Sequence, residues 1–269
     1  MIEPLLLTAA RISTFERAKG LTNASGFFFA RDDHLFLVTS RHVMYDEPSK
    51  HYPDRIEIEI HKDPDNLTQS IGFSIPLYRD GRGIWRQGVD AGGEIDVAVI
   101  EIERAALPPT TLMLPFTPAH LPLASDAIEV GHSVLIVGFP LGFHDTLHHL
   151  PVVRQARIAS SYGIRFQGHG YFLTDGRTHR GTSGSPVVMR SPQGMAGALP
   201  WKLIGVHSAR LDMGDRDLVH DESLGLNSAW YADILLTLTA PQDAKLPSSV
   251  GDVKPLRAPR QRAANTDGG

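Results

Sequence analysis

Short apolar runs bounded by turn residues recur along the whole chain, and almost no stretch keeps the 3.6-residue period of an amphipathic helix. Such runs are typical of β-strands. The clearest begins with Ile-Glu-Ile-Glu-Ile and predicts a strand over residues 56–61 with one apolar face and one acidic face exposed to water. Further strands in the first half are predicted at residues 5–12, 26–30, 35–39, 70–77 and 96–102. Together these strands are enough for one small β-barrel.

A proline-rich stretch then interrupts the pattern, because neither a helix nor a β-ladder runs far through repeated prolines. We expect a linker at residues 106–122, between an N-terminal β-barrel at 1–105 and a second β-barrel at 123–239. The strands predicted for the second barrel are residues 133–139, 152–160, 171–174, 186–189, 202–208 and 226–230. Residues 231–238 are apolar enough for a short helix. The expected fold is therefore all-β, with two six-stranded antiparallel β-barrels and a short C-terminal helix.

Composition narrows the class of protein. Of the 269 residues, 42% are hydrophobic and 21% are charged, which is typical of a packed globular protein. A formal net charge of −4 gives no electrostatic reason to expect binding to nucleic acid or to an anionic membrane. Residues 1–12 lack a basic start followed by a long apolar run, so we expect no secretion signal and a cytoplasmic protein. The polar, proline-bearing residues 240–269 predict a disordered tail.

The chain contains no cysteine, which excludes disulfides, a thiol nucleophile and thiolate metal ligands. The strongest chemical signal is Gly-Thr-Ser-Gly-Ser-Pro at residues 181–186. Glycines on both sides of Ser183 allow a tight turn that points backbone amides at a reacting oxygen. A serine hydroxyl is a poor nucleophile alone and needs a base and a group that orients the base. His42 after one apolar strand and Asp96 at the start of another are the candidates.

These segments resemble those of the trypsin-like peptidase superfamily, in which the order of the triad along the chain is His, Asp, Ser. The resemblance covers residues 24–238 and is closest to the disulfide-free bacterial branch, which includes the high-temperature-requirement proteases and the glutamyl endopeptidases. The chain departs from the pattern mildly, at residues 40–41. The resemblance implies a chymotrypsin-like double barrel and peptide hydrolysis through an acyl-enzyme. His42 is then the general base, Asp96 the orienting carboxylate and Ser183 the nucleophile.

The same resemblance implies further roles. The amides of Gly181 and Ser183 would form the oxyanion hole, and Ser208 would lie on the strand that lines the specificity pocket, within reach of Asp96. The pocket would also contain Arg177, Thr178 and His207. Because a hydroxyl, an imidazole and a guanidinium can all donate to a carboxylate, we expect cleavage after Glu or Asp, with Gln as the neutral alternative. Thr182 stands where zymogen-type relatives carry an aspartate, so activation through a newly cut N-terminus is not expected.

Three alternatives remain beside the endopeptidase. The fold can serve as a catalytically silent binding module, and the same triad can act as an esterase on small acyl substrates. Thirteen histidines, above all His144, His148 and His149, raise the question of a metal. Without a carboxylate motif at helical spacing we interpret these histidines as a polar loop beside the cleft. We therefore expect no metal, no cofactor and no nucleic-acid or membrane partner, only a protein or peptide substrate.

Overall fold

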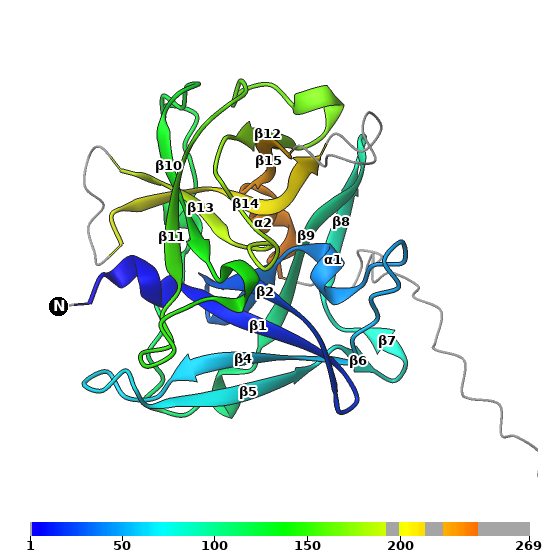
Figure 1. Ribbon diagram of the computed structural model, residues 1–269, viewed down its shortest axis with the longest axis vertical. Coiled ribbons are helices and arrows are strands. Elements are labelled where there is room, and N and C mark those ends of the chain that lie inside the picture. Colours follow the sequence, from blue (N-terminus) through cyan, green and yellow to red (C-terminus); the bar gives the residue numbers. More distant parts are fainter. Residues whose placement is uncertain (1, 192–198, 213–222, 242–269) are drawn as a thin grey trace, which may run out of the picture.

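The computed structural model describes residues 2–191, 199–212 and 223–241. Most of its strands form two large antiparallel sheets, and Figure 1 shows β1, β4 and β5 in the lower part of the view and β10 to β15 in the upper part. The all-β expectation, with two sheets and a short C-terminal helix, is confirmed. Residues 242–269, most of the expected disordered tail, lie outside the described residues.

The first sheet has the strand order β5-β4-β1-β2-β3-β9-β8. Its strands are β1 (Ala9–Glu16), β2 (Lys19–Arg31), β3 (His34–Thr39), β4 (Arg55–His61), β5 (Ser70–Pro76), β8 (Arg86–Asp90) and β9 (Gly93–Ile102). A two-residue pair, β6 (Tyr78–Arg79) with β7 (Arg82–Gly83), and a one-turn helix α1 (Arg41–Met44) complete this half.

The sheet has seven strands where six were expected. The additional strand is β8, whose only large apolar residue is Val89, so that no alternating pattern marks it. Residues 5–8 were expected to begin a strand, but they belong to a 3₁₀-helix (Pro4–Thr8) that starts with a proline and buries Leu5 and Leu7.

The second sheet has the strand order β11-β10-β13-β14-β15-β12. Its strands are β10 (Ser133–Gly138), β11 (Val152–Arg157), β12 (Tyr171–Thr174), β13 (Pro186–Arg190), β14 (Trp201–Asp212) and β15 (Ser223–Tyr231), and the helix α2 (Ile234–Leu238) follows. In the described part of the chain no helix is long and apolar enough to cross a bilayer.

The alternation in β4 was predicted correctly for its apolar face, since Ile56, Ile58 and Ile60 are all buried. The acidic face is less exposed than expected. The Glu59 side chain is 21% exposed, because Arg11 from β1 and Ser70 from β5 both donate hydrogen bonds to it. Neighbouring strands thus supply the partners that make a half-buried carboxylate acceptable.

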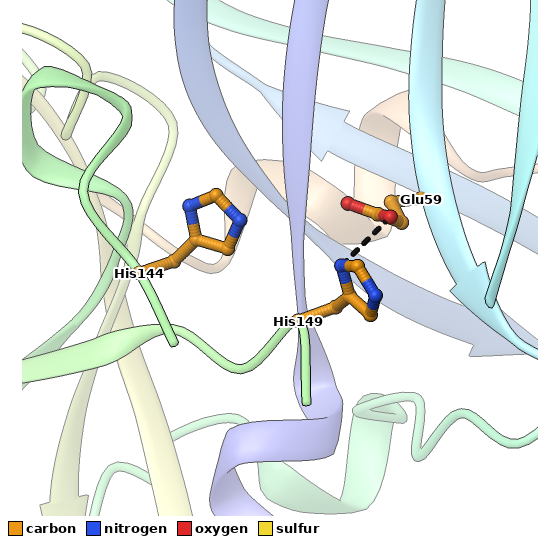
Figure 2. A group of neighbouring side chains, drawn as sticks. All are labelled: Glu59, His144 and His149. Carbon is orange, nitrogen blue, oxygen red and sulfur yellow. Dashed lines mark ion pairs between the residues drawn. The ribbon is translucent and has the colours of Figure 1, made fainter. Parts of the chain in front are cut away.

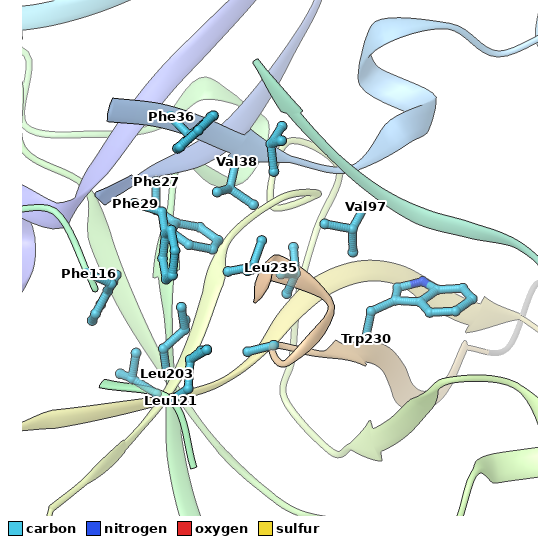
Figure 3. Packing of buried hydrophobic residues seen from close by; sticks show 14 of the residues in the cluster. Phe27, Phe29, Phe36, Val38, Val97, Phe116, Leu121, Leu203, Trp230 and Leu235 are labelled. Atoms are coloured by element: carbon cyan, nitrogen blue, oxygen red, sulfur yellow. The ribbon is translucent and has the colours of Figure 1, made fainter. Parts of the chain in front are cut away.

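The largest core cluster belongs to both halves. Phe27, Phe29 and Val97 from the first sheet meet Leu203 and Trp230 from the second, as Figure 3 shows. Each half also has a smaller cluster of its own. Because the shared cluster is apolar and buried, separating the halves would expose it to water, so the hydrophobic effect holds the two sheets together.

The proline-rich stretch packs against the first sheet at Phe116. Its amide donates to Phe28 O at 2.9 Å, and its carbonyl accepts from the Ala30 amide at 2.7 Å. The ring is fully buried and meets Phe27 edge to face. The segment that joins the halves is therefore anchored in the shared core.

Replacing Phe116 by Ala should lower the free energy of unfolding by about 3–5 kcal/mol, because the change leaves a cavity in the core that both halves share. Urea denaturation followed by tryptophan fluorescence measures this. Leu123→Ala in the same region is the matched control: that side chain is 62% exposed, and its loss should change the free energy by no more than about 0.5 kcal/mol. Equal effects of the two variants would contradict the buried position of Phe116.

Candidate active site

His42 and Asp96 come together through strand pairing. His42 lies in α1, directly after β3, and Asp96 lies near the start of β9, which is the neighbour of β3 in the sheet. The Asp96 carboxylate binds His42 twice: Oδ1 accepts the His42 backbone amide at 2.9 Å, and Oδ2 lies 2.7 Å from Nδ1. Because a carboxylate can only accept a hydrogen bond, Nδ1 carries the proton, and Nε2 has a free lone pair.

Ser208 on β14 completes the surroundings of Asp96, since its hydroxyl also donates to Oδ2. Burial disfavours the charge on Asp96, but the hydrogen bonds and charge of His42 together with the Ser208 hydroxyl outweigh it, and the pKa of Asp96 is lowered. For His42, burial opposes protonation, while the hydrogen bond and charge of Asp96 outweigh burial and raise the pKa. Asp96 is therefore a stable anion that holds the imidazole and supports its protonated form.

The turn that carries Ser183 requires glycine at two positions. Gly181 has φ +91° and Gly184 has φ +84°, conformations that other residues rarely adopt. A Cβ atom on Gly181 would lie 2.7 Å from Phe139 O, and one on Gly184 would lie 2.2 Å from Ser25 O. The turn thus packs directly against the backbone of β2 in the other half.

Ser25 on β2 holds this turn in place, and the sequence analysis missed it. Its backbone amide donates to Ser183 O at 3.0 Å, and its hydroxyl donates to Gly181 O at 2.7 Å. The same hydroxyl accepts the amide of Phe139 at 2.9 Å. The available signal was a serine directly before the apolar run of β2, because a serine that is buried with such a run must find hydrogen-bond partners.

The amides of Gly181 and Ser183 donate to no acceptor among the described residues. Buried backbone amides are nearly always paired, so two unpaired amides on either side of Thr182 are suited to an anion. The carbonyl of Arg180, which precedes them, accepts the Leu141 amide at 2.6 Å and is thereby held in place.

The Ser183 hydroxyl donates to the carbonyl of Ser208 at 3.0 Å. Between residues 2 and 241, with the gaps named above, no hydrogen bond joins this hydroxyl to His42. Such bonds are often long or absent in a free enzyme and tighten when a substrate is bound. A rotation of the serine side chain is the movement needed to bring its proton to His42.

The residues predicted to line the specificity pocket differ in how deeply they are buried. Thr178 and His207 are buried, whereas Arg177 is exposed. The Thr178 hydroxyl donates to Asn227 Oδ1, and the Asn227 amide in turn donates to Gly176 O at 2.6 Å. Asn227 is a second residue that the sequence analysis missed.

His207 is a neutral histidine at physiological pH. Burial and then the charge of His42 lower its pKa to about 4. Its amide donates to Ser185 O at 2.9 Å, which places β14 directly beside the Ser183 turn, and its Nδ1 has no hydrogen-bond partner among the described residues. His207 can therefore supply a hydrogen bond, but not a positive charge.

A cleft of about 550 Å³ opens beside His42, Gly181 and Ser183. Its other walls come from the region between β1 and β2 and from the loop after α1, with Asn23 and Tyr52 among the lining residues. Neither Thr178 nor His207 lines it. These two predicted specificity residues are therefore not part of the cleft wall.

Comparison with known proteins shows the family of the chain. The family described as trypsin-like peptidase domain matches residues 24–194, a span that contains His42, Asp96 and Ser183. The fold is similar to the crystal structure of the serine endoprotease from Yersinia pestis, with a TM-score of 0.52 and 15% identity over 87% of this chain and 62% of that one. At this identity the likeness concerns the fold alone, and this chain spans less than two thirds of that protein. No curated protein matches this chain in sequence.

Replacing Asp96 by Asn should lower the pKa of His42, because the carboxylate is the group that raises it above its ordinary value of 6.5. NMR titration of the imidazole resonances is expected to give a pKa above 6.5 in the wild type and a clearly lower one in Asp96→Asn. The titration of His120, whose pKa is lowered chiefly by burial and without a contribution from Asp96, should be the same in both proteins. An unchanged His42 titration would contradict the coupling of the two residues.

Proposed function

Because the chain belongs to the family of trypsin-like peptidase domains, we propose that it is a serine endopeptidase whose catalytic triad is His42, Asp96 and Ser183. The observation that carries the proposal is that the Asp96 carboxylate forms two hydrogen bonds with His42, one to the backbone amide and one to Nδ1. The bond to Nδ1 fixes the tautomer in which Nε2 accepts a proton. Both the serine and two unpaired amides lie at the same cleft.

The proposed reaction is acyl transfer to Ser183. The serine hydroxyl turns from the carbonyl of Ser208, gives its proton to His42 Nε2 and attacks the carbonyl carbon of the scissile peptide bond. The amides of Gly181 and Ser183 stabilise the oxyanion of the tetrahedral intermediate, where the loss of one donor typically costs about 3–4 kcal/mol.

The second half of the reaction returns the enzyme to its starting state. The intermediate collapses to an acyl-enzyme as His42 gives its proton to the leaving amine. Water then attacks the acyl carbonyl while His42 takes a proton from it, and the carboxylic acid product leaves with Ser183 restored. Asp96 stabilises the imidazolium at both stages without taking its proton.

The cleft that is lined by His42, but by neither Thr178 nor His207, is suited to the leaving-group side of the substrate.

Replacing Ser183 or His42 by Ala should reduce peptide hydrolysis by several orders of magnitude without unfolding the protein, and Asp96→Asn should reduce it by about 10⁴-fold. A fluorophosphonate probe, with the modified residue located by mass spectrometry, should label Ser183 in the wild type and nothing in Ser183→Ala. Ser161→Ala, at an exposed serine, should be labelled as the wild type is.

Wild-type turnover by Ser183→Ala would overturn the assignment. Labelling of Ser183 together with hydrolysis of small acyl esters but of no peptide would favour the esterase. The absence of both labelling and turnover would favour a catalytically silent binding module.

For specificity we propose cleavage after Glu or Asp, with Gln as the neutral alternative. The support is that Thr178 and His207, a hydroxyl and a neutral imidazole, are both buried near the Ser183 turn. To bind a substrate carboxylate, the Thr178 hydroxyl must turn away from Asn227 Oδ1. Arg177 is exposed, and a solvated guanidinium adds less to such a site than a buried donor does.

A peptide library should show preferred cleavage after Glu or Asp, and His207→Ala should weaken this preference, because it removes a donor near the carboxylate. Arg177→Gln is the matched control at an exposed position. A larger loss of preference in this control than in His207→Ala would assign the recognition to Arg177. A library that favours Lys, Arg or bulky apolar residues before the cut would end the acidic-pocket proposal.

A further inference from the structure

A group of side chains that could bind a metal ion lies outside the proposed triad. Glu59 on β4 of the first sheet faces His144 and His149 in the loop between β10 and β11, as Figure 2 shows. Their ligand atoms all lie within 4.8 Å of one another. We propose that Glu59, His144 and His149 bind a divalent transition-metal ion of the zinc type. The expectation of no metal rested on the lack of a carboxylate motif at helical spacing, and Glu59 escaped it because this residue comes from the other half of the chain.

His144 is already oriented to act as a ligand. Its Nδ1 lies 2.7 Å from the carbonyl oxygen of Gly142. A carbonyl only accepts, so Nδ1 carries the proton and Nε2 presents a lone pair. Histidines that bind metals typically donate their other ring nitrogen to a carbonyl or carboxylate in this way, which fixes both the tautomer and the direction of the ring.

Glu59 is oriented in a comparable way. Ser70 donates to Oε1 at 2.8 Å, and Arg11 donates to Oε2 at 3.2 Å. Hydrogen bonds of this kind hold a ligating carboxylate in place. The Arg11 guanidinium also balances part of the charge of the Glu59 carboxylate. A bound ion, held by the two imidazoles as well, must therefore compete with Arg11 for this carboxylate.

In His149 the buried ring nitrogen Nδ1 makes no hydrogen bond to the described residues. Its Nδ1 lies 2.8 Å from Glu59 Oε1, but the contact lacks the direction of a hydrogen bond, and this buried atom has no other partner among the described residues. The backbone of His149 has φ +55°, in the left-handed region that non-glycine residues seldom adopt. Such conformations gather at functional sites, where the surrounding structure compensates for their cost.

The donor set indicates the class of ion. Two imidazoles and one carboxylate form a zinc set that leaves a fourth position for water, whereas magnesium and calcium prefer oxygen ligands. Bonds of about 2.0–2.1 Å place tetrahedral ligand atoms about 3.3 Å apart. The close pair of Glu59 and His149 must therefore open slightly, and the widest pair must close by up to about 1.5 Å. Because both histidines lie on one loop, the loop can make this adjustment.

Zinc titration by calorimetry tests the site on the full chain, carried as Ser183→Ala so that self-cleavage cannot interfere, after metal is removed with a chelator. We expect one ion per chain and a higher melting temperature with zinc, because the ion binds only the folded chain. His144→Ala should weaken binding by at least about 100-fold. This variant is informative because it removes a ligand and keeps the 2.8 Å contact between Glu59 and His149.

His148→Ala is the matched control. His148 is a histidine of the same loop that pairs with Asp145 and is outside the group, so this variant should bind zinc as the parent does. No saturable binding by the parent, or equal affinity in the parent and His144→Ala, would overturn the proposal. Since neither readout uses peptide hydrolysis, the result does not depend on the proposed function.

Discussion

The close approach of two backbone segments from opposite halves is the constraint on which the rest of the structure depends. Ser25 on β2 and the Ser183 turn lie so near each other that a Cβ atom on Gly184 would be 2.2 Å from Ser25 O. Gly138 on β10 borders the same contact, since its Cβ would lie 2.6 Å from the Ser25 hydroxyl. Glycine at these positions lets the halves meet, and Ser25 then supplies the hydrogen bonds that shape the turn.

Two kinds of force maintain this contact. The shared apolar core presses the halves together without direction, while hydrogen bonds such as those of Ser25 and Ser208 set the final positions. The bonds between His42 and Asp96 follow from the pairing of β3 with β9 within one half, and Ser208 of the other half adds one more hydrogen bond to Asp96. Ser183 reaches them only if the two halves are correctly aligned. The position of Ser183 relative to His42 and Asp96 is therefore set by how the two sheets pack against each other.

The sequence was sufficient for the parts of the fold that have a local signal. Apolar runs placed most strands, and the sequence motifs named His42 and Ser183, which line one cleft, and Asp96, which binds His42. Ser25, Asn227 and Glu59 were missed because their importance comes from partners far away in the chain. Strand β8 was missed because it is polar and depends on β9 for its hydrogen bonds. A single sequence without structure gives no information about such partners.

The bond between the Ser25 hydroxyl and Gly181 O joins residues 156 positions apart, and this separation has a consequence for the newly made protein. A ribosome releases the first half, with His42 and Asp96, long before the segment with Ser183 emerges. The turn cannot take its shape until the later strands pack onto β2, and contacts between such distant residues form late in folding. On the proposed assignment, a nascent or half-folded chain has the base His42 but no correctly placed nucleophile. Such a chain cannot hydrolyse neighbouring proteins before its own fold is complete.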